Sequence, residues 1–416
     1  MTTLTLEPRA DELSLADVTQ KYPDVSPFVI LKTDIQRRGI AYTERALAAV
    51  DPKLYLTRVR TIFGPDAGPN HHVPVSFSLR DGTSVLISPN ELMPNPYTID
   101  QIDGLPVLVD NGKIIDEVEY WYRPHFLDKV TSKGTPMWHV VAVARPNRLD
   151  FNPYGACHFW DDGKGCRFCN VGAIWKKYGE GRPARIDSED AYETMREALK
   201  QPGRFVNFQV TGGSIPGEGN EFKQEVDGYI EILKALGKNF TTRRFPSHLL
   251  SSAFTEEHLI RIREETGLLT WTADIEVLDE EKFAWICPGK HARVGYREWI
   301  RRLVRGVQIF GRGYVNTGFV AGVELAKPKG FASEDEALAR TLESADELAW
   351  EGIVAVGQVF RPSPLSAFHK QHAPSLEYFV RLAKGLDTIR RHHRLHIDLD
   401  DYRRCGNHGD TDLARL

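Results

Sequence analysis

Three of the five cysteines in the sequence lie in one short loop, at Cys157, Cys166 and Cys169. This close spacing is hard to explain by packing. Three thiolates on one loop form the sulfur-rich donor set that selects zinc, copper(I) or an iron–sulfur cluster. Gly163 and Gly165 allow the backbone to curl around a bound ion or cluster. The loop therefore predicts a metal site, and the lack of a fourth cysteine nearby in the sequence predicts one open coordination position.

The fourth ligand distinguishes the possible sites. A structural zinc site closes with four ligands, and His158 is poorly placed to serve because it is adjacent to Cys157. Cys405 or His408, near the other end of the sequence, can supply the missing ligand. Three hypotheses follow: an enzyme with an iron–sulfur cluster that keeps one iron open, a zinc protein that is a hydrolase or has a structural zinc site, and a non-catalytic iron–sulfur protein for electron transfer.

Short apolar strands and amphipathic helices alternate around and after this loop, which predicts a parallel sheet covered by helices, either open or closed into a barrel. The expected strands are 137–144, 149–154, 206–210, 268–277, 314–323 and 352–360. The expected helices are 188–200, 221–236, 255–265, 296–310 and 333–351, the last opening with the capping-box pattern Ser333-x-x-Glu336. In such a barrel, chemistry takes place at the carboxyl ends of the strands.

Polar and glycine residues stand at several of these strand ends. Thr211-Gly-Gly-Ser214 follows the strand at 206–210, and Ala273-Asp-Ile-Glu-Val277 ends the strand at 268–277. Taken alone, a Gly-Gly pair is usually a turn and a strand-end glutamate usually lies on the surface. Most of these groups nevertheless lie at the carboxyl ends of strands, where a parallel barrel carries its chemistry.

Together these residues resemble the radical S-adenosylmethionine (SAM) superfamily. Its mark is Cys-x-x-Cys with an aromatic residue before the last cysteine, here Cys166-Arg-Phe168-Cys169, near the start of a (βα) barrel. The family usually places its first cysteine four positions before the second. The gap here is nine positions, a C-x8-C-x2-C pattern, so the chain resembles a divergent member.

The resemblance implies a [4Fe–4S] cluster on Cys157, Cys166 and Cys169, with SAM bound beside it. It places the SAM amino group at Gly212, Gly213 and Ser214, where serine replaces the usual glutamate. It further implies that Glu276, or alternatively Asp274, contacts the ribose or the methionyl carboxylate. The remaining implied contacts are to the aromatic Phe168, to Gly322 in the segment Gly318-Phe-Val-Ala-Gly-Val-Glu324, and to Val359 beside the adenine.

The implied reaction is reductive cleavage of SAM to a 5′-deoxyadenosyl radical that abstracts hydrogen from a small-molecule substrate. An external flavodoxin- or ferredoxin-like protein would donate the electron. The reaction outcome and the catalytic residue stay open: Cys405 is a candidate hydrogen donor, and Arg244, Arg361 and His369 are candidates for the substrate lining. Cys287 is expected to pack as a small apolar side chain.

The sequence divides into an N-terminal α+β domain at 1–140, the barrel at 141–395 and a polar, irregular tail at 396–416. In the first part, two strand-like segments flank Asn111-Gly112, a pair typical of a tight hairpin turn. The role of this domain is not readable from its sequence. Either it or the tail is expected to cover the barrel.

Bulk properties exclude some classes of protein. A net charge of −4 in 416 residues gives no basic field for a long nucleic acid. No apolar run is long enough to span a membrane, and Met1–Leu15 does not resemble a signal peptide. We therefore expect a cytoplasmic protein, in which clustered cysteines stay reduced and act as ligands.

Overall fold

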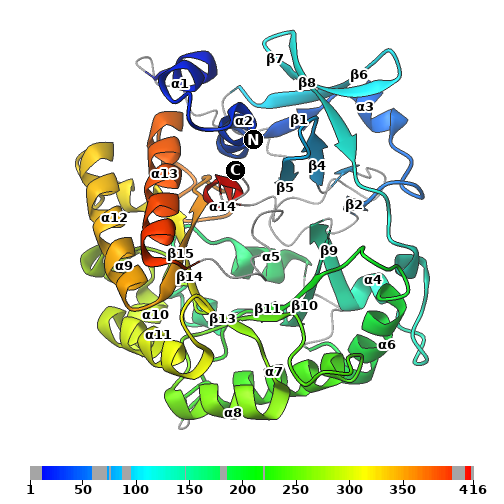
Figure 1. Cartoon of the computed structure of the whole chain (residues 1–416), viewed down its shortest axis with the longest axis vertical. Coiled ribbons are helices and arrows are strands. Elements are labelled where there is room, and N and C mark those ends of the chain that lie inside the picture. The colour runs from blue at the N-terminus through cyan, green and yellow to red at the C-terminus, as the bar shows by residue number, and fades with distance from the viewer. Residues whose placement is uncertain are drawn as a thin grey trace.

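The computed structural model describes residues 12–58, 73–74, 76–86, 95–145, 147–178, 185–218, 221–395 and 408–413. It contains a curved seven-stranded sheet wrapped by helices and a second, six-stranded sheet built from the N-terminal part of the chain (Figure 1). None of the described helices combines the length and the apolar character that a membrane crossing requires.

The curved sheet is an open half-barrel with strand order β15-β14-β13-β12-β11-β10-β9. Strands β10 to β15 are parallel to their neighbours, and β9 pairs antiparallel with β10. The predicted α/β class and partial parallel barrel are confirmed. The strands are β9 (Val141–Arg145), β10 (Arg148–Tyr154), β11 (Asn207–Gly212), β12 (Ser247–Leu250), β13 (Thr270–Thr272), β14 (Val315–Ala321) and β15 (Ile353–Val359).

Three strand predictions differ from the structure. Residues Met137–Val140 form a helical turn, so the strand expected at 137–144 begins at Val141. Strand β12 was not predicted, because it has only four residues and begins with two polar ones, which is too little for a hydrophobic pattern. The strand expected at 268–277 ends at Thr272, and further along Glu276 has a left-handed backbone (φ 72°) that an extended strand does not allow.

The predicted helices of the barrel are confirmed, with ends that differ by two residues or fewer. Ser333 caps the last of the predicted helices, where its Oγ accepts the Glu336 N–H at 3.2 Å. The Glu336 carboxylate accepts the N–H of Ala332 at 3.0 Å and not that of Ser333, so the reciprocal bond of the expected capping box goes to the preceding residue. The helices are α4 (Met137–Val140), α5 (Val171–Tyr178), α6 (Ser188–Ala198), α7 (Lys223–Gly237), α8 (Glu256–Thr266), α9 (Glu280–Ile286), α10 (Pro288–Arg293), α11 (Tyr296–Phe310), α12 (Glu334–Trp350) and α13 (Leu376–His393).

The six-stranded sheet has the order β1-β6-β7-β8-β4-β5 and its own apolar core. The expected hairpin joins β7 to β8, where Asn111 (φ 48°) and Gly112 (φ 77°) take the positive φ angles of its turn. The N-terminal elements are α1 (Leu15–Lys21), α2 (Pro27–Arg38), β1 (Ile40–Tyr42), α3 (Glu44–Ala49), β2 (Thr57–Arg58), β3 (Val73–Pro74), β4 (Ser76–Leu79), β5 (Ser84–Leu86), β6 (Tyr97–Ile102), β7 (Leu105–Asp110) and β8 (Lys113–Tyr120).

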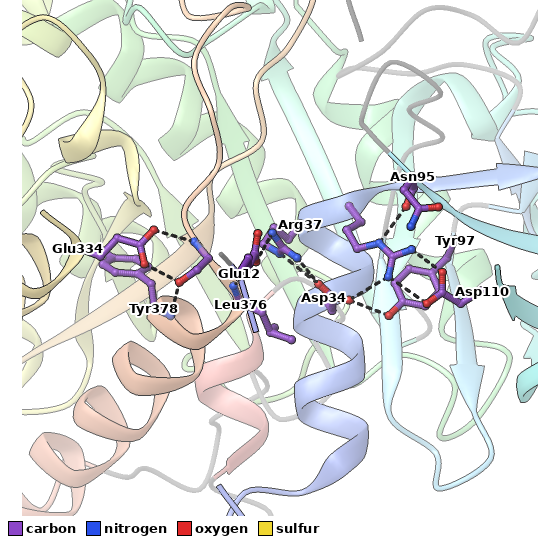
Figure 2. Close-up of polar contacts among 11 residues, drawn as sticks. Glu12, Asp34, Arg37, Asn95, Tyr97, Asp110, Glu334, Leu376 and Tyr378 are labelled. Carbon is purple, nitrogen blue, oxygen red and sulfur yellow. Dashed lines mark hydrogen bonds and ion pairs between the residues drawn. The ribbon is translucent and has the colours of Figure 1, made fainter. Parts of the chain in front are cut away.

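Helix α2 connects this sheet to the barrel (Figure 2). Its Asp34 accepts the Tyr97 hydroxyl of β6 at 2.7 Å and also pairs with Arg37 at 2.8 Å. Arg37 in turn pairs with Glu12 at 2.6 Å, and Glu12 accepts the N–H of Leu376, the first residue of α13, at 2.9 Å. One polar chain therefore runs from the N-terminal sheet to a barrel helix, and the domain boundary near residue 140 stays a prediction.

The described end of the C-terminal tail is ordered, although the sequence predicts an irregular segment there. Residues Gly409–Asp412 form the short helix α14, which lies between α2 and α13. Asp412 forms a fully buried ion pair with Lys32 of α2, and Asp410 pairs with Arg390 of α13 at 2.8 Å. His408 donates to the carbonyl of Gly357 at 3.0 Å, so the tail also contacts β15, an edge strand of the half-barrel.

Candidate functional site

The residues singled out in the sequence lie at the carboxyl ends of the parallel strands. The cysteine loop follows β10, Gly213 and Ser214 follow β11, Asp274 and Glu276 follow β13, and Gly322 follows β14. Parallel strands end at one edge of a sheet, so the chain order brings these segments together. Cys405 lies outside the described residues.

The cysteine loop is folded around an aromatic side chain. Trp160 ends a short 3-10 turn (His158–Trp160) that begins after Cys157, and its indole covers two glycines. A Cβ atom on Gly165 or Gly172 would lie 2.6 or 2.2 Å from that ring. Glycine is therefore needed at both positions to let the loop close on Trp160 and enter α5.

The three thiols are partly buried and adjoin one another. Burial raises the pKa of Cys157, and burial together with the Cys166 and Cys157 thiols raises the pKa of Cys169 to about 12. The pKa of Cys166 is raised first by its hydrogen bond with Cys287 and then by burial. Without a metal these cysteines are therefore neutral thiols, whereas a bound cation would deprotonate them.

The donor set suits a soft metal or cluster, although the described residues hold no group of three or more His, Cys, Asp or Glu side chains already arranged around one ion position. His158 pairs instead with Asp161 at 2.7 Å, near the surface. His408 bonds to the Gly357 carbonyl. The histidines considered as fourth ligands thus have other partners, and the three thiols remain as the common donor set.

Cys287 packs in the core, as predicted, with an exposed fraction of 0%. Its contact with Cys166 was not predicted. The contact arises because the cysteine loop packs on α9 and α10: Arg167 N–H donates to Ile286 O at 2.9 Å, and Gly289 N–H to Lys164 O at 3.0 Å. The segment 286–290, which joins α9 to α10, therefore packs directly against the cysteine loop.

The Gly-Gly-Ser segment is bound directly to the cysteine loop. Gly213 N–H donates to Tyr154 O at 3.0 Å, and His158 N–H donates to Ser214 O at 2.9 Å. A Cβ atom on Gly213 would lie 1.9 Å from Ala156 O, and one on Gly212 would lie 2.8 Å from Tyr154 O. These glycines allow two backbones to touch, so the segment is more than a surface turn.

A buried carboxylate that the sequence analysis missed lies behind this segment. Glu225 of α7, fully buried, accepts Ile215 N–H at 2.8 Å and both the N–H (3.1 Å) and the hydroxyl (3.0 Å) of Ser252. The Ser252 hydroxyl also lies 3.0 Å from Ser214 Oγ. Burial raises the pKa of Glu225 to about 7 even though these donors lower it. The sequence feature that could have revealed Glu225 is its place on the apolar face of an amphipathic helix.

Asp274 and Glu276 surround a second missed residue, Lys290. Its ammonium donates to Asp274 O and to Glu276 Oε1, both at 2.6 Å, and lies 4.8 Å from the Trp299 ring centre. Burial lowers the pKa of Lys290, but Glu276 and the nearby thiols outweigh it and keep the side chain charged. The Asp274 carboxylate accepts Gly318 N–H at 2.7 Å. Lys290 therefore places a buried positive charge beside the cysteines.

The strands β14 and β15 place the remaining candidates differently. A Cβ atom on Gly322 would meet Pro374 at 2.3 Å, so this glycine packs against the segment before α13. A Cβ atom on Gly357 would meet Leu386 of α13, and Val359 shares that side of β15 by alternation. Gln358 lies on the other side, the side of Asp274. Phe168 is partly buried against the main core.

Comparisons with known proteins give distant similarities, and no family model matches. The bacteriochlorophyllide c C-7(1)-hydroxylase of Chlorobaculum limnaeum is 21% identical over 272 residues, which are 62% of this chain and 63% of that protein. The chain thus spans under two thirds of that relative.

Among solved structures, a radical SAM methyltransferase from Sphaerobacter thermophilus aligns with 96% of this chain and 99% of its own, at 16% identity and a TM-score of 0.41. Methylornithine synthase aligns with 64% and 78%, at 15% identity and a TM-score of 0.40.

Proposed function

We propose that this chain, similar to radical SAM enzymes, is itself such an enzyme and uses a [4Fe–4S] cluster and SAM to abstract hydrogen from a small-molecule substrate. The observation that carries the proposal is the bonding of the three-cysteine loop after β10 to the Gly-Gly-Ser segment after β11. These two segments would hold a cluster and its co-substrate side by side.

Cys157, Cys166 and Cys169 would hold the cluster, which when bound supplies the electron that cleaves SAM to methionine and a 5′-deoxyadenosyl radical. The chain's own residues position the reactants and exclude water. Gly212 and Gly213 have no Cβ atom, so the end of β11 lies against the backbone of the cysteine loop, and a ligand held by one segment would lie beside the other. Asp274, Glu276 and Gln358 offer polar contacts on the inner side of the sheet.

Glu225 would act through Ser214. Ser252 donates its hydroxyl hydrogen to Glu225, which leaves the Ser252 oxygen free to accept from Ser214. A Ser214 hydroxyl oriented in this way turns its lone pairs away from Ser252. The Ser214 oxygen can then accept a hydrogen bond from the amino group of SAM. In the radical SAM family a glutamate at this position usually binds that group.

The electron would come from an external flavodoxin- or ferredoxin-like donor. The hydroxylase and methyltransferase named above catalyse different outcomes, so the similarities favour no particular reaction here. The N-terminal part and the tail, joined to β15 and α13 by α2 and α14, would shield the open side of the half-barrel.

The test is anaerobic purification followed by measurement of iron, sulfide and zinc, and then an assay for 5′-deoxyadenosine with SAM and dithionite. We expect about four irons and four sulfides per chain, lost in Cys157→Ala, Cys166→Ala and Cys169→Ala. Cys287→Ala, a buried cysteine outside the donor set, is the matched control and should retain the cluster.

Other outcomes would support the alternatives. One zinc per chain without sulfide would replace the proposal with a zinc hydrolase or a structural zinc protein. A stable cluster that never cleaves SAM would point to an iron–sulfur electron-transfer protein.

A further inference from the structure

Arg361, just after β15, is a cation without a protein partner. Among the described residues it makes no hydrogen bond and no ion pair. The buried cations of the described chain behave differently, because each pairs with a carboxylate: these are Lys32, Arg148, Lys282, Lys290, Arg302 and Arg390. Arg361 is partly buried and lacks such a partner among the described residues.

Its surroundings are poor in counter-charge, and the partly buried side chain keeps some contact with water. Desolvation lowers the pKa of the Arg361 guanidinium to about 10, and no acidic side chain offsets this loss. The group is still charged at neutral pH. A charge withdrawn from water without a partner is costly, and proteins keep such groups where a ligand completes the pairing.

The segment that carries Arg361 lies against the cysteine loop. Two residues beyond it, Ser363 Oγ accepts the side-chain N–H of Asn170, the neighbour of Cys169, at 2.8 Å. Phe368 N–H donates to Arg167 O at 3.1 Å. On its other side, Phe360 N–H donates to Ala321 O at 3.1 Å, next to Gly322. Arg361 is thus held between the ends of β14 and β15 and the cysteine loop.

The other charges of the site are already matched. Lys290 pairs with Glu276, and Asp274 accepts Gly318 N–H. Arg361 therefore remains as an unmatched positive charge at this edge of the sheet. A guanidinium presents a planar fork of donors that fits the two oxygens of a carboxylate or a phosphate.

We propose that Arg361 binds an anionic group of the substrate, a carboxylate or a phosphate, and holds the substrate beside the cysteine loop. That the bound molecule is a substrate rests on the proposed function. The anion site itself rests only on the position of Arg361 and its lack of a partner, so the two can fail separately.

The experiment titrates the full-length chain with inorganic phosphate and with succinate by calorimetry at constant ionic strength. The wild-type chain should bind at least one of these anions with a millimolar dissociation constant, and the stronger of the two identifies the anion class. Arg361→Gln should weaken that binding at least tenfold. Arg361→Lys, which keeps the charge but loses the fork, should weaken it less.

Arg244, a lining candidate in the sequence, is exposed just before β12, at the amino end of that strand and not at the carboxyl ends that carry the site. Arg340→Gln is the matched control, because Arg340 is an exposed cation of α12 that pairs with Glu343 at 2.8 Å. It should leave anion binding unchanged. Substrate-free SAM cleavage and the SAM dissociation constant, measured on the reconstituted holoenzyme, should change less than twofold in Arg361→Gln.

Three results overturn the proposal. In the first, the wild-type chain binds neither phosphate nor succinate. In the second, Arg361→Gln and Arg361→Lys bind the anion as tightly as the wild-type chain does. A tenfold loss of SAM affinity in a folded Arg361 variant also overturns it, because Arg361 would then contact SAM. Failure of the chain to hold any cluster defeats the proposed function instead, and the anion titration can still be read on the metal-free protein.

Discussion

At the scale of single residues, the site depends on buried charges whose partners come from distant parts of the chain. Lys290 joins Asp274 and Glu276 and lies near Cys166 and Cys287. The buried charge near a cluster is one of the factors that sets its reduction potential. Lys290 would therefore favour the reduced state of the proposed cluster.

We predict that Lys290→Met lowers the reduction potential of the cluster. Loss of one unit charge several ångströms away is worth on the order of 1–2 kcal/mol at a partly screened site. This corresponds to a shift of several tens of millivolts for one electron. Electron paramagnetic resonance during a redox titration measures this shift in potential. Lys290→Arg keeps the charge and is the control.

Equal reduction potentials in the wild type and in Lys290→Met would contradict the prediction. They would show that the ammonium is too far away to affect the cluster.

Glu225 gives a prediction about pH. Its pKa is about 7 in the folded chain and about 4.5 when exposed, so folding favours the protonated form. The stability that this group contributes is complete below pH 4.5 and is lost as the pH rises through 7. The expected loss is about 3 kcal/mol. Urea unfolding of the metal-free chain between pH 4.5 and 8 measures it.

Glu225→Gln should remove this pH dependence. It should also lower stability at every pH, because the amide nitrogen cannot accept from Ile215 or Ser252. The exposed Glu117→Gln is the control and should leave the pH profile as it is. A profile that stays the same in Glu225→Gln would assign the slope to another group.

At the scale of elements, the site is a set of backbone contacts between the ends of neighbouring strands. The end of β11 touches the start of the cysteine loop because Gly212 and Gly213 have no side chains. The α9–α10 pair supports the other end of the loop through Arg167 and Gly289. The loop is therefore held on both sides by elements far away in the sequence.

We predict that Gly213→Ala separates β11 from the cysteine loop. The new Cβ atom would lie 1.9 Å from a backbone oxygen, so the backbone must move. A destabilisation of about 1–3 kcal/mol is expected from overpacking, together with a lower iron content per chain. Thermal unfolding and iron analysis measure the two effects. Gly237→Ala, at the end of α7, is the control. Its Cβ atom would meet the Phe245 ring at 3.3 Å, which a small movement of that side chain relieves, so it should cost much less than Gly213→Ala and leave the iron content unchanged.

At the scale of the whole molecule, α2, α13 and α14 join the N-terminal sheet to the half-barrel. The Lys32–Asp412 and Arg390–Asp410 pairs are both buried, and they connect α14 to two different helices. In Figure 1, α14 lies between α13 and the N-terminal sheet. The last described residues therefore belong to the folded core.

We predict that Asp412→Ala destabilises the chain by about 3–5 kcal/mol, because it leaves the Lys32 charge buried without a partner. Lys32→Met combined with Asp412→Leu should recover much of this loss. Denaturant unfolding measures both. Asp24→Ala removes the partner of Lys384 in an exposed pair and should cost at most about 1 kcal/mol. An equal, small effect of both substitutions would mean that α14 is not part of the cooperative core.

The sequence by itself determined the features that local pattern encodes. The barrel helices, most of the parallel strands and the Asn111-Gly112 turn follow from periodicity, capping and backbone preference, which act over a few neighbouring residues. The cysteine loop was recognisable because its donor set lies within thirteen positions. Strand β12 was missed because four residues carry too little pattern.

Only the tertiary structure decided which groups stand behind that loop. Glu225, Lys290 and the contact of Cys287 with Cys166 depend on segments separated by up to about 120 residues in the sequence. The unpaired state of Arg361 and the burial of α14 are likewise properties of the folded chain. The sequence shows the type of a charged or polar residue but not whether its side chain is solvated, paired or desolvated. Burial and pairing are set by which surfaces meet, and that is decided when the strands and helices assemble.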